Sequence, residues 1–420
     1  MVLKRRDFIK AGASAAIGVA GCARWCRSVA PCVGEAYPGW RTGELDIHFI
    51  NTGVGEQTFF IFPDGTTMLL DCGDGFSRKY VDVIVPRRPS SERLGGEWVS
   101  RYVQRLVTGR VIDYFLLSHW HGDHCGSLSM RSKTLPDGRK VCGVPLFAED
   151  FDIRRYFDHQ WPDAFVNPYT DKSCIKMMRE WVGHMRKRCG MEPNRLEVGA
   201  ENQIAMLHGG AGRYSFSVRN VCANGVYCDA GGNIVDFKPE YAKLYPKIKG
   251  GVDENVLSAG IRLAYGPFSA FFGGDILTPD YERRVGNAVG RVDVCKTNHH
   301  ACAGQMSEAF CSAVKAQVYL SSVWGLGHVN EKSLGRMASK SLYDGDRIVM
   351  YGCLPQERAV EYAGRDFMSV LPPAQGHSVI KVAPGGRTFD ALVLSSDDES
   401  MRVLYRRSFV SCGSAERVAG

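Results

Sequence analysis

The stretch from Ser118 to Gly126 reads Ser-His-Trp-His-Gly-Asp-His-Cys-Gly and places three imidazoles and a carboxylate within six residues. The four side chains that can donate a lone pair to a cation are His119, His121, Asp123 and His124. Imidazole nitrogen and carboxylate oxygen suit Zn²⁺, Mn²⁺ or iron, and such donor sets leave coordination positions open for water. The alternative is a histidine-rich surface turn, but scattered histidines seldom fall at this spacing. The stretch therefore predicts a metal centre.

An apolar run from Val111 to Leu117 precedes these donors and has the length of a buried strand. Gly122 then permits the turn that folds the donors back toward one point. A central strand is a stiff platform, which a site of fixed geometry requires.

Two β-hairpins are predicted from their turn residues. Residues 58–62 and 67–70 flank Pro63-Asp64-Gly65, and residues 261–265 and 269–272 flank Gly266-Pro267. Each hairpin ends in an aspartate eight residues after its proline, Asp71 in the first and Asp275 in the second. A helical stretch and a strand that ends in histidine follow each hairpin. We therefore expect an internal duplication whose two halves meet at one site.

The second half supplies further donors at its strand ends. Asp275 follows an aromatic-rich strand, where an ionised carboxylate is costly unless it meets a metal or hydrogen-bond donors. Residues 294–296 form the next expected strand, and His299 and His300 follow it. Lys296 is expected to reach an anionic group, with a solvated lysine at the strand end as the alternative.

The spacing His-x-His-x-Asp-His resembles the signature of the metallo-β-lactamase superfamily. The resemblance implies an α/β fold, a four-layer αββα sandwich, in which His119 and His121 hold one metal while Asp123 and His124 hold the other. It also implies that Asp123 handles protons during catalysis.

The same resemblance assigns roles to the second group of residues. Asp275 stands where the family has the aspartate that joins both metals, and His299 matches the last metal ligand, with His300 beside it. Which of the two histidines faces the metal is a question of register, and we favour His299. Asp71 matches an aspartate that steadies the metal-binding loop by hydrogen bonds.

One ligand departs from the family pattern. Typical members have a third histidine before the second hairpin, but here residues 251–258 read Gly-Val-Asp-Glu-Asn-Val-Leu-Ser, so Glu254 or Asn255 stands at that place. Oxygen donors there favour Mn²⁺ over Zn²⁺. We expect one or two divalent metals, zinc or manganese.

The chain also resembles one branch of the superfamily, the hydrolase domain of the ComEC competence DNA-uptake family and its free-standing exported relatives. Asn298, Ala301 and Cys302 depart from the glycines and serine of that branch, and the membrane channel of ComEC is absent, so DNA transport is not implied. The matching segments are residues 47–55, residues 62–71, Asn255-x-x-Ser258, Gly274-Asp275, His299-His300 and Gly325-Leu326-Gly327-His328.

These residues predict a metal-dependent hydrolase that acts on phosphodiesters, nucleic acid or nucleotide-like small anions. A bound metal lowers the pKa of water from 15.7 to about 7 and so supplies hydroxide at neutral pH. His328 is a candidate for touching the substrate or donating a proton, with a structural turn histidine as the alternative. Two other functions stay open: hydrolysis of a lactone, thioester or β-lactam, and a non-enzymatic metal-bearing binding protein.

Composition places these residues in an ordinary globular protein. The 420 residues are 45% apolar and 23% charged, and the formal charge of +7 allows an anionic substrate without requiring one. We divide the chain into a signal peptide over 1–22, a linker over 23–43 and a hydrolase domain over 44–412, with an insertion over roughly 130–250. No protein partner is identifiable.

The N-terminus resembles a twin-arginine signal peptide. Lys4-Arg5-Arg6-Asp7-Phe8-Ile9-Lys10 precedes a weakly apolar stretch, and Val19-Ala20-Gly21-Cys22 resembles a lipobox in which Cys22 is lipidated. We expect an exported protein, periplasmic or tethered to the membrane through Cys22, with no transmembrane helix. The alternatives are a chance arginine pair and a plain cleavage site beyond Cys22.

Overall fold

The computed structural model describes residues 31–75, 85–129, 131–163, 172–248 and 251–413. The predicted signal peptide and Cys22 lie outside these residues. Among the described helices, none combines the length and apolarity needed to cross a bilayer.

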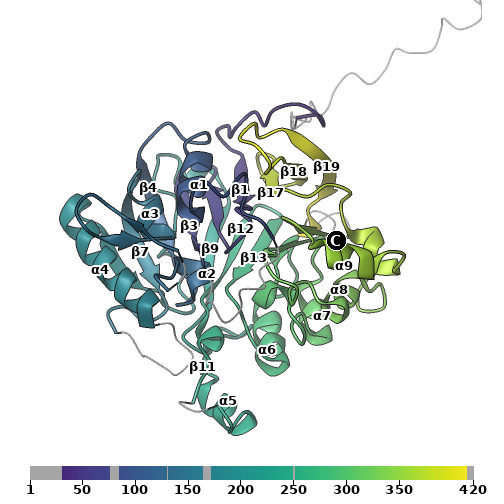
Figure 1. Ribbon diagram of the computed structural model, residues 1–420. Coiled ribbons are helices and arrows are strands. Elements are labelled where there is room, and N and C mark those ends of the chain that lie inside the picture. The colour runs from purple at the N-terminus through teal and green to yellow at the C-terminus, as the bar shows by residue number, and fades with distance from the viewer. Residues whose placement is uncertain (1–30, 76–84, 130, 164–171, 249–250, 414–420) are drawn as a thin grey trace, which may run out of the picture.

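Two large sheets form the centre of the molecule (Figure 1). The first has nine strands in the order β19-β18-β17-β1-β2-β3-β4-β7-β8. Their bounds are β1 Leu45–Phe49, β2 Thr58–Ile61, β3 Thr67–Leu70, β4 Val111–Leu116, β7 Asp152–Asp158, β8 Glu192–Arg195, β17 His377–Val382, β18 Thr388–Leu394 and β19 Val403–Val410.

The second sheet has eight strands in the order β11-β10-β9-β12-β13-β14-β15-β16, and a separate pair joins β5 Lys133–Thr134 to β6 Lys140–Val141. The strands of the second sheet are β9 Phe216–Ala223, β10 Val226–Cys228, β11 Ile234–Asp236, β12 Gly260–Tyr265, β13 Phe268–Gly273, β14 Val294–Lys296, β15 Val318–Ser321 and β16 Ile348–Tyr351.

Helices cover the outer faces of both sheets, α1, α3 and α4 on one side and α6 to α9 on the other (Figure 1). Short 3₁₀ segments, η2 Ala211–Arg213, η3 Glu254–Leu257, η4 Asn298–Ala301 and η5 Asp366–Val370, lie in the connections. The helices are α1 Gly95–Val103, α2 Gly122–Cys125, α3 Val144–Phe147, α4 Lys172–Cys189, α5 Lys238–Leu244, α6 Pro279–Val289, α7 Glu308–Val314, α8 Glu331–Ala338 and α9 Gln356–Tyr362.

Three apolar cores hold these layers together. The central core contains side chains of both sheets, including Phe60 of β2 and Phe272 of β13, whose rings meet edge to face at 5.0 Å. The other two cores join each sheet to its own helices. This arrangement is the predicted four-layer αββα sandwich, so the fold class is confirmed.

The two halves repeat the same local pattern, as the turn residues predicted. In the first, β2 and β3 form an antiparallel hairpin, and β3 pairs in parallel with β4. In the second, β12 and β13 form a hairpin, and β13 pairs in parallel with β14. Helices α1 and α6 lie between hairpin and parallel strand in the chain.

The segment 130–250, predicted as an insertion, contributes to both sheets. β7 pairs in parallel with β4, and β9 pairs along the length of β12. Helix α4 packs its apolar side, including Met178, Trp181 and Met185, into the core beneath the first sheet. Strands β7 and β9 and helix α4 are therefore structural parts of the sandwich.

The predicted linker, 23–43, packs on the body over its last ten residues. The Gly34 amide donates to the Val403 carbonyl at 2.8 Å, and the Tyr37 amide donates to the Met401 carbonyl at 3.0 Å. Residues 34–43 therefore belong to the body and do not act as a free tether.

Replacing Trp181 tests whether α4 belongs to the core. Trp181→Ala removes a side chain that is 3% exposed and is expected to lower the free energy of unfolding by about 3–5 kcal/mol. Its neighbour Glu180 is exposed, so Glu180→Ala is expected to change stability by less than about 0.5 kcal/mol. Urea unfolding of both variants gives the comparison, and equal stabilities would show that α4 is peripheral.

Candidate metal centre

Four buried side chains from distant parts of the chain converge at one edge of the sandwich. They are Glu56, His124, Asp275 and His300, and one ligand atom from each lies within 4.8 Å of the others. Glu56 lies between β1 and β2, His124 in α2 after β4, Asp275 after β13, and His300 in η4 after β14.

Strand direction explains why these residues meet. β3, β4 and β7 run parallel in the first sheet, and β13, β14 and β15 run parallel in the second. Residues that follow parallel strands leave the sheet at the same edge, which is where α/β folds place their ligands. The two halves therefore deliver their strand-end side chains to a common point.

Atom Oδ2 of Asp275 is the atom that the imidazoles approach. The Nε2 atoms of His124 and His300 lie 3.2 and 3.1 Å from it. Those of His119 and His299 lie 4.0 and 3.9 Å away. Four imidazoles from both halves thus surround one carboxylate oxygen.

Several buried polar atoms around Asp275 lack a hydrogen-bond partner among the described residues, including Nε2 of His124 and Oδ1 of Asp123. Buried polar atoms are rarely left in this state. Donor atoms bound at about 2.0–2.2 Å to one ion lie about 3–4 Å apart, which is the spacing found around Asp275. The donor set therefore fits a divalent cation, with nitrogen and oxygen ligands that suit zinc or manganese.

Lys296 contributes a fixed positive charge to the cluster. Its side chain is 1% exposed, and its ammonium lies 3.0 Å from Oε1 of Glu56 and 3.3 Å from Oδ1 of Asp275. It also donates to the Gly274 carbonyl at 2.8 Å. Burial lowers the pKa of Lys296, but Glu56 and Asp275 outweigh it and raise the pKa above its usual value. Lys296 thus holds two carboxylates of the cluster and is not a solvated lysine.

Opposing charges also set the protonation of the imidazoles. Burial lowers the pKa of His300, but Asp275 and Asp123 outweigh it and raise the pKa to about 9. Burial likewise opposes charge on His124, whose pKa Asp275 and Asp123 raise well above its usual value. Burial raises the pKa of Asp123, and His124 and His300 bring it down to about 2. Without a cation both imidazoles carry protons, which a metal has to displace.

Asp71 holds the two ends of the segment from Ser118 to His124 by hydrogen bonds. One carboxylate oxygen accepts the Ser118 amide and the other accepts the Ser118 hydroxyl, each at 2.7 Å. Asp71 also lies 2.8 Å from Nδ1 of His124. A hydrogen on that Nδ1 leaves Nε2 directed at the cluster, so Asp71 fixes which nitrogen can bind a cation.

His119 and His121 form a second group beside the first. Nε2 of His119 lies 3.1 Å from Nδ1 of His121. Nearby, Oε1 of Glu254 accepts the Trp120 amide at 3.0 Å and lies 3.3 Å from Nε2 of His159. Glu254 thus stands next to the predicted ligands.

The other candidate at that place, Asn255, lies in the same short η3 segment. The backbone amide of Asn255 donates to Oδ1 of Asp253 at 2.9 Å, which makes Asp253 the N-terminal cap of η3. The side-chain oxygen of Asn255 is buried without a partner among the residues that the structure describes.

The backbone of η4 lets consecutive histidines reach Asp275. His299 and His300 have φ of 42° and 52°, in the left-handed region, and Ala301 follows at 55°. In an extended strand successive side chains point to opposite faces, but this turn directs both rings to one carboxylate. His300 is the buried, nearer histidine, whereas His299, which we favoured, is 28% exposed and farther from Asp275.

His328 lies against His300 with the rings stacked at 4.6 Å. Its Nδ1 accepts the Trp324 amide at 3.3 Å, so a hydrogen on Nε2 is the one it can offer. Burial and the neighbouring His300 hold the pKa of His328 well below its usual value. The ring is therefore neutral at pH 7, a hydrogen-bond donor rather than an acid.

Three residues of this region were missed in the sequence, Glu56, His159 and Ser322. Glu56 directly follows Gly53-Val54-Gly55, where an acidic residue beside two glycines was a usable signal. His159 and Ser322 each follow a strand without any accompanying motif, so only the folded structure places them.

No protein-family model and no curated protein sequence matches the chain. Solved structures that resemble it distantly include the following three. A protein assigned as a metal-dependent hydrolase from Parabacteroides distasonis is 13% identical, with a TM-score of 0.33, and the match covers 74% of this chain and 96% of that one. The short form of human tRNase Z is 10% identical, with a TM-score of 0.32 and coverage of 80% and 98%.

The third is zinc-bound PqqB from Methylobacterium extorquens, which is 12% identical, with a TM-score of 0.32 and coverage of 80% and 99%. These likenesses are distant and transfer neither an activity nor a substrate to this chain.

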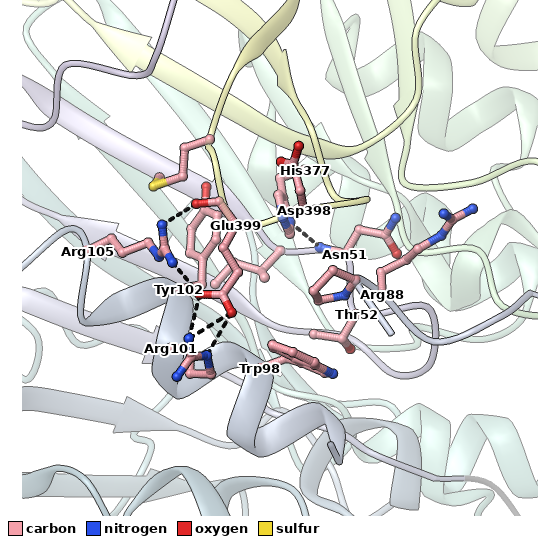
Figure 2. Close-up of a pocket in the computed structure, with 13 residues that line it drawn as sticks. Asn51, Thr52, Arg88, Trp98, Arg101, Tyr102, Arg105, His377, Asp398 and Glu399 are labelled. Carbon is pink, nitrogen blue, oxygen red and sulfur yellow. Dashed lines mark hydrogen bonds and ion pairs between the residues drawn. The ribbon is translucent and has the colours of Figure 1, made fainter. Parts of the chain in front are cut away.

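A separate cavity lies between α1 and the end of β1 (Figure 2). Figure 2 shows Glu399 reaching Arg101 and Arg105 of the α1 region beside it. The free space is about 20 Å³, room for a single water. None of the cluster's donors line this cavity, so it is separate from the candidate metal centre.

His377 in the wall of this cavity predicts a pH dependence of stability. Burial and then His48 lower its pKa to about 3, against 6.5 in an unfolded chain. Between these values the unfolded state binds the extra proton, so this contribution is complete above pH 6.5 and is lost as pH falls toward 3.

Nδ1 of His377 accepts a hydrogen bond from the backbone amide of Asn51 at 3.0 Å. The variant His377→Asn keeps an acceptor at this place but has no group that titrates in this pH range. From pH 6.5 to pH 4 the wild type is expected to lose up to about 3 kcal/mol more than the variant in urea unfolding. Parallel losses in the two proteins would show that His377 does not titrate in this way.

Proposed function

We propose that the chain is a metal-dependent hydrolase of the metallo-β-lactamase superfamily. The observation that carries the proposal is the meeting of Glu56, His124, Asp275 and His300, four buried donors from four segments of both halves. Burying so many ionisable groups at one point is costly unless a cation joins them. A structural role alone does not require this set.

In the proposed reaction Glu56, His124, Asp275 and His300 hold the cation. When bound, a divalent cation lowers the pKa of water to about 7 and supplies hydroxide at neutral pH. Oδ1 of Asp123 accepts a hydrogen bond from the attacking water, because this oxygen is buried and has no partner among the described residues. The Nε2 hydrogen of His328 is available to an oxygen of the bound substrate.

We further propose that the substrate is a phosphodiester or a nucleotide-like anion. The support is the resemblance of the run through Asp71 and of Gly325-Leu326-Gly327-His328 to the ComEC-type branch, together with a net positive charge. Of the formal +7, Lys4, Arg5, Arg6 and Lys10 against Asp7 contribute +3, which leaves about +4 for the rest of the chain. A lactone, thioester or β-lactam is the alternative that substrate tests have to separate.

Removing the cation and removing its ligands are expected to have the same effect. Metal-free protein should not hydrolyse a bis-aryl phosphodiester, and Mn²⁺ or Zn²⁺ should restore turnover. His124→Ala and Asp275→Asn are each expected to lower kcat/KM more than about 100-fold. Mutating residues that only support metal ligands already lowers metal affinity or activity about 10–100-fold.

The matched control is His184→Ala, which removes a partly exposed histidine of α4 and should leave kcat/KM unchanged. Assays on phosphodiester, lactone, thioester and β-lactam substrates measure the outcome. Metal-dependent turnover of an acyl substrate alone would reject the phosphodiester class, and no turnover with any metal would reject the hydrolase.

We also propose export through a twin-arginine signal and lipidation at Cys22, supported by the N-terminal motif. Replacing Arg5 and Arg6 with lysine is expected to leave full-length precursor in the cytoplasm. Cys22→Ser is expected to move the protein from the membrane to the soluble fraction, whereas Cys26→Ser should not. Fractionation and immunoblotting measure this, and unchanged distribution would contradict the assignment.

A further inference from the structure

Ser322, the residue after β15, touches two of the four proposed ligands at once. Its Oγ lies 2.8 Å from Oε2 of Glu56 and 2.6 Å from Nδ1 of His300. The side chain is buried, and it directly follows β15, which pairs with β14 on one side and β16 on the other.

The direction of these two hydrogen bonds follows from the other partner of Glu56. The ammonium of Lys296 lies 3.0 Å from Oε1, so Glu56 acts as a carboxylate and can only accept. The Ser322 hydroxyl has one hydrogen, which it donates to Oε2. It must then accept from His300, whose ring carries a hydrogen on Nδ1.

This hydrogen decides which His300 nitrogen can bind a cation. A neutral imidazole with hydrogen on Nδ1 has its lone pair on Nε2. That Nε2 lies 3.2 Å from Asp123 and 3.1 Å from Asp275, inside the cluster. The opposite tautomer, with hydrogen on Nε2, turns an N–H toward the cation. Oε2 of Glu56 and Nδ1 of His300 would then both need the single hydrogen of the Ser322 hydroxyl.

His300 also needs restraint because its backbone is strained. A non-glycine residue at φ 52° is held only where surrounding contacts determine it. The Val329 amide holds the His300 carbonyl at 2.9 Å, and the His328 ring covers one face. Ser322 supplies the polar contact that sets the rotation of the ring.

We propose that Ser322 is a positioning residue that selects the metal-binding tautomer of His300 and orients Glu56 through one hydroxyl. The proposal rests on the metal centre of the proposed function and adds to it a residue that does not itself touch the cation. It acts on affinity for the cation, which can be measured without any substrate.

The test measures the Kd of Mn²⁺ and Zn²⁺ by competition with a chelating indicator at neutral pH. Ser322→Ala is expected to raise the Kd by about 10–100-fold, as for other groups that orient metal ligands. Ser322→Thr retains the hydroxyl and is expected to bind close to wild type. Ser321→Ala is the matched control, because the Ser321 hydroxyl is also buried but contacts Thr297 at 3.0 Å rather than a ligand.

A second measurement needs no variant at Ser322. Ring-nitrogen NMR of zinc-loaded protein, with His300 assigned by its loss in His300→Gln, is expected to show hydrogen on Nδ1. This result stands even if Ser322→Ala fails to fold, and hydrogen on Nε2 would overturn the proposal.

The outcomes separate the two claims. A wild type that binds no cation removes both the proposed function and the role of Ser322. A wild type that binds a cation equally well after Ser322→Ala, or a Ser321→Ala variant with the same loss, overturns Ser322 alone. Weakened binding in Ser322→Ala without turnover of any substrate supports the positioning role and rejects the hydrolase.

Discussion

The burial of negative charge around Asp275 is the constraint on which the site depends. Glu56, Asp123 and Asp275 are each no more than 2% exposed, and Lys296 is the buried lysine among them. A carboxylate removed from water costs several kcal/mol unless a partner compensates it. Without a cation His124 takes part of that role as an imidazolium, and a bound cation can replace its proton.

The packing of two sheets allows this many charged side chains to be buried at one point. Each half alone supplies one carboxylate and one imidazole of the four proposed ligands, which would lie at a solvated sheet edge. The central core, with Phe60 and Phe272 in contact, fixes the distance between the halves and closes the edge from water. Strands β7 to β11 widen both sheets at their outer sides, and His159, which follows β7, lies 3.3 Å from Glu254 beside the second group of donors.

Much of the frame could be predicted because turn chemistry is local. Proline and glycine in the two hairpins placed Asp71 and Asp275, and the apolar run before His119 placed the strand that carries the loop. The site was harder, since it depends on contacts between residues far apart in the chain. Three consecutive non-glycine residues with positive φ, at His299 to Ala301, have no signature in sequence, and this turn decides that His300 lies closest to Asp275. Glu56 is separated from its partner Ser322 by 266 residues, so neither reveals the other.

The two groups of donors differ in how ready they are for a cation. Around Asp275 the Nε2 of His124 has no hydrogen-bond partner among the described residues, and a cation entering there displaces protons and the contact between His300 and Asp123. In the second group His119 and His121 contact each other at 3.1 Å, and Glu254 accepts the Trp120 amide and lies beside His159. A second cation would have to separate His119 from His121 and compete with Trp120 and His159 for the carboxylate of Glu254. At the first position Lys296 already pairs with Glu56 and Asp275, so a cation there also shares its carboxylates, but it has no imidazole pair to separate.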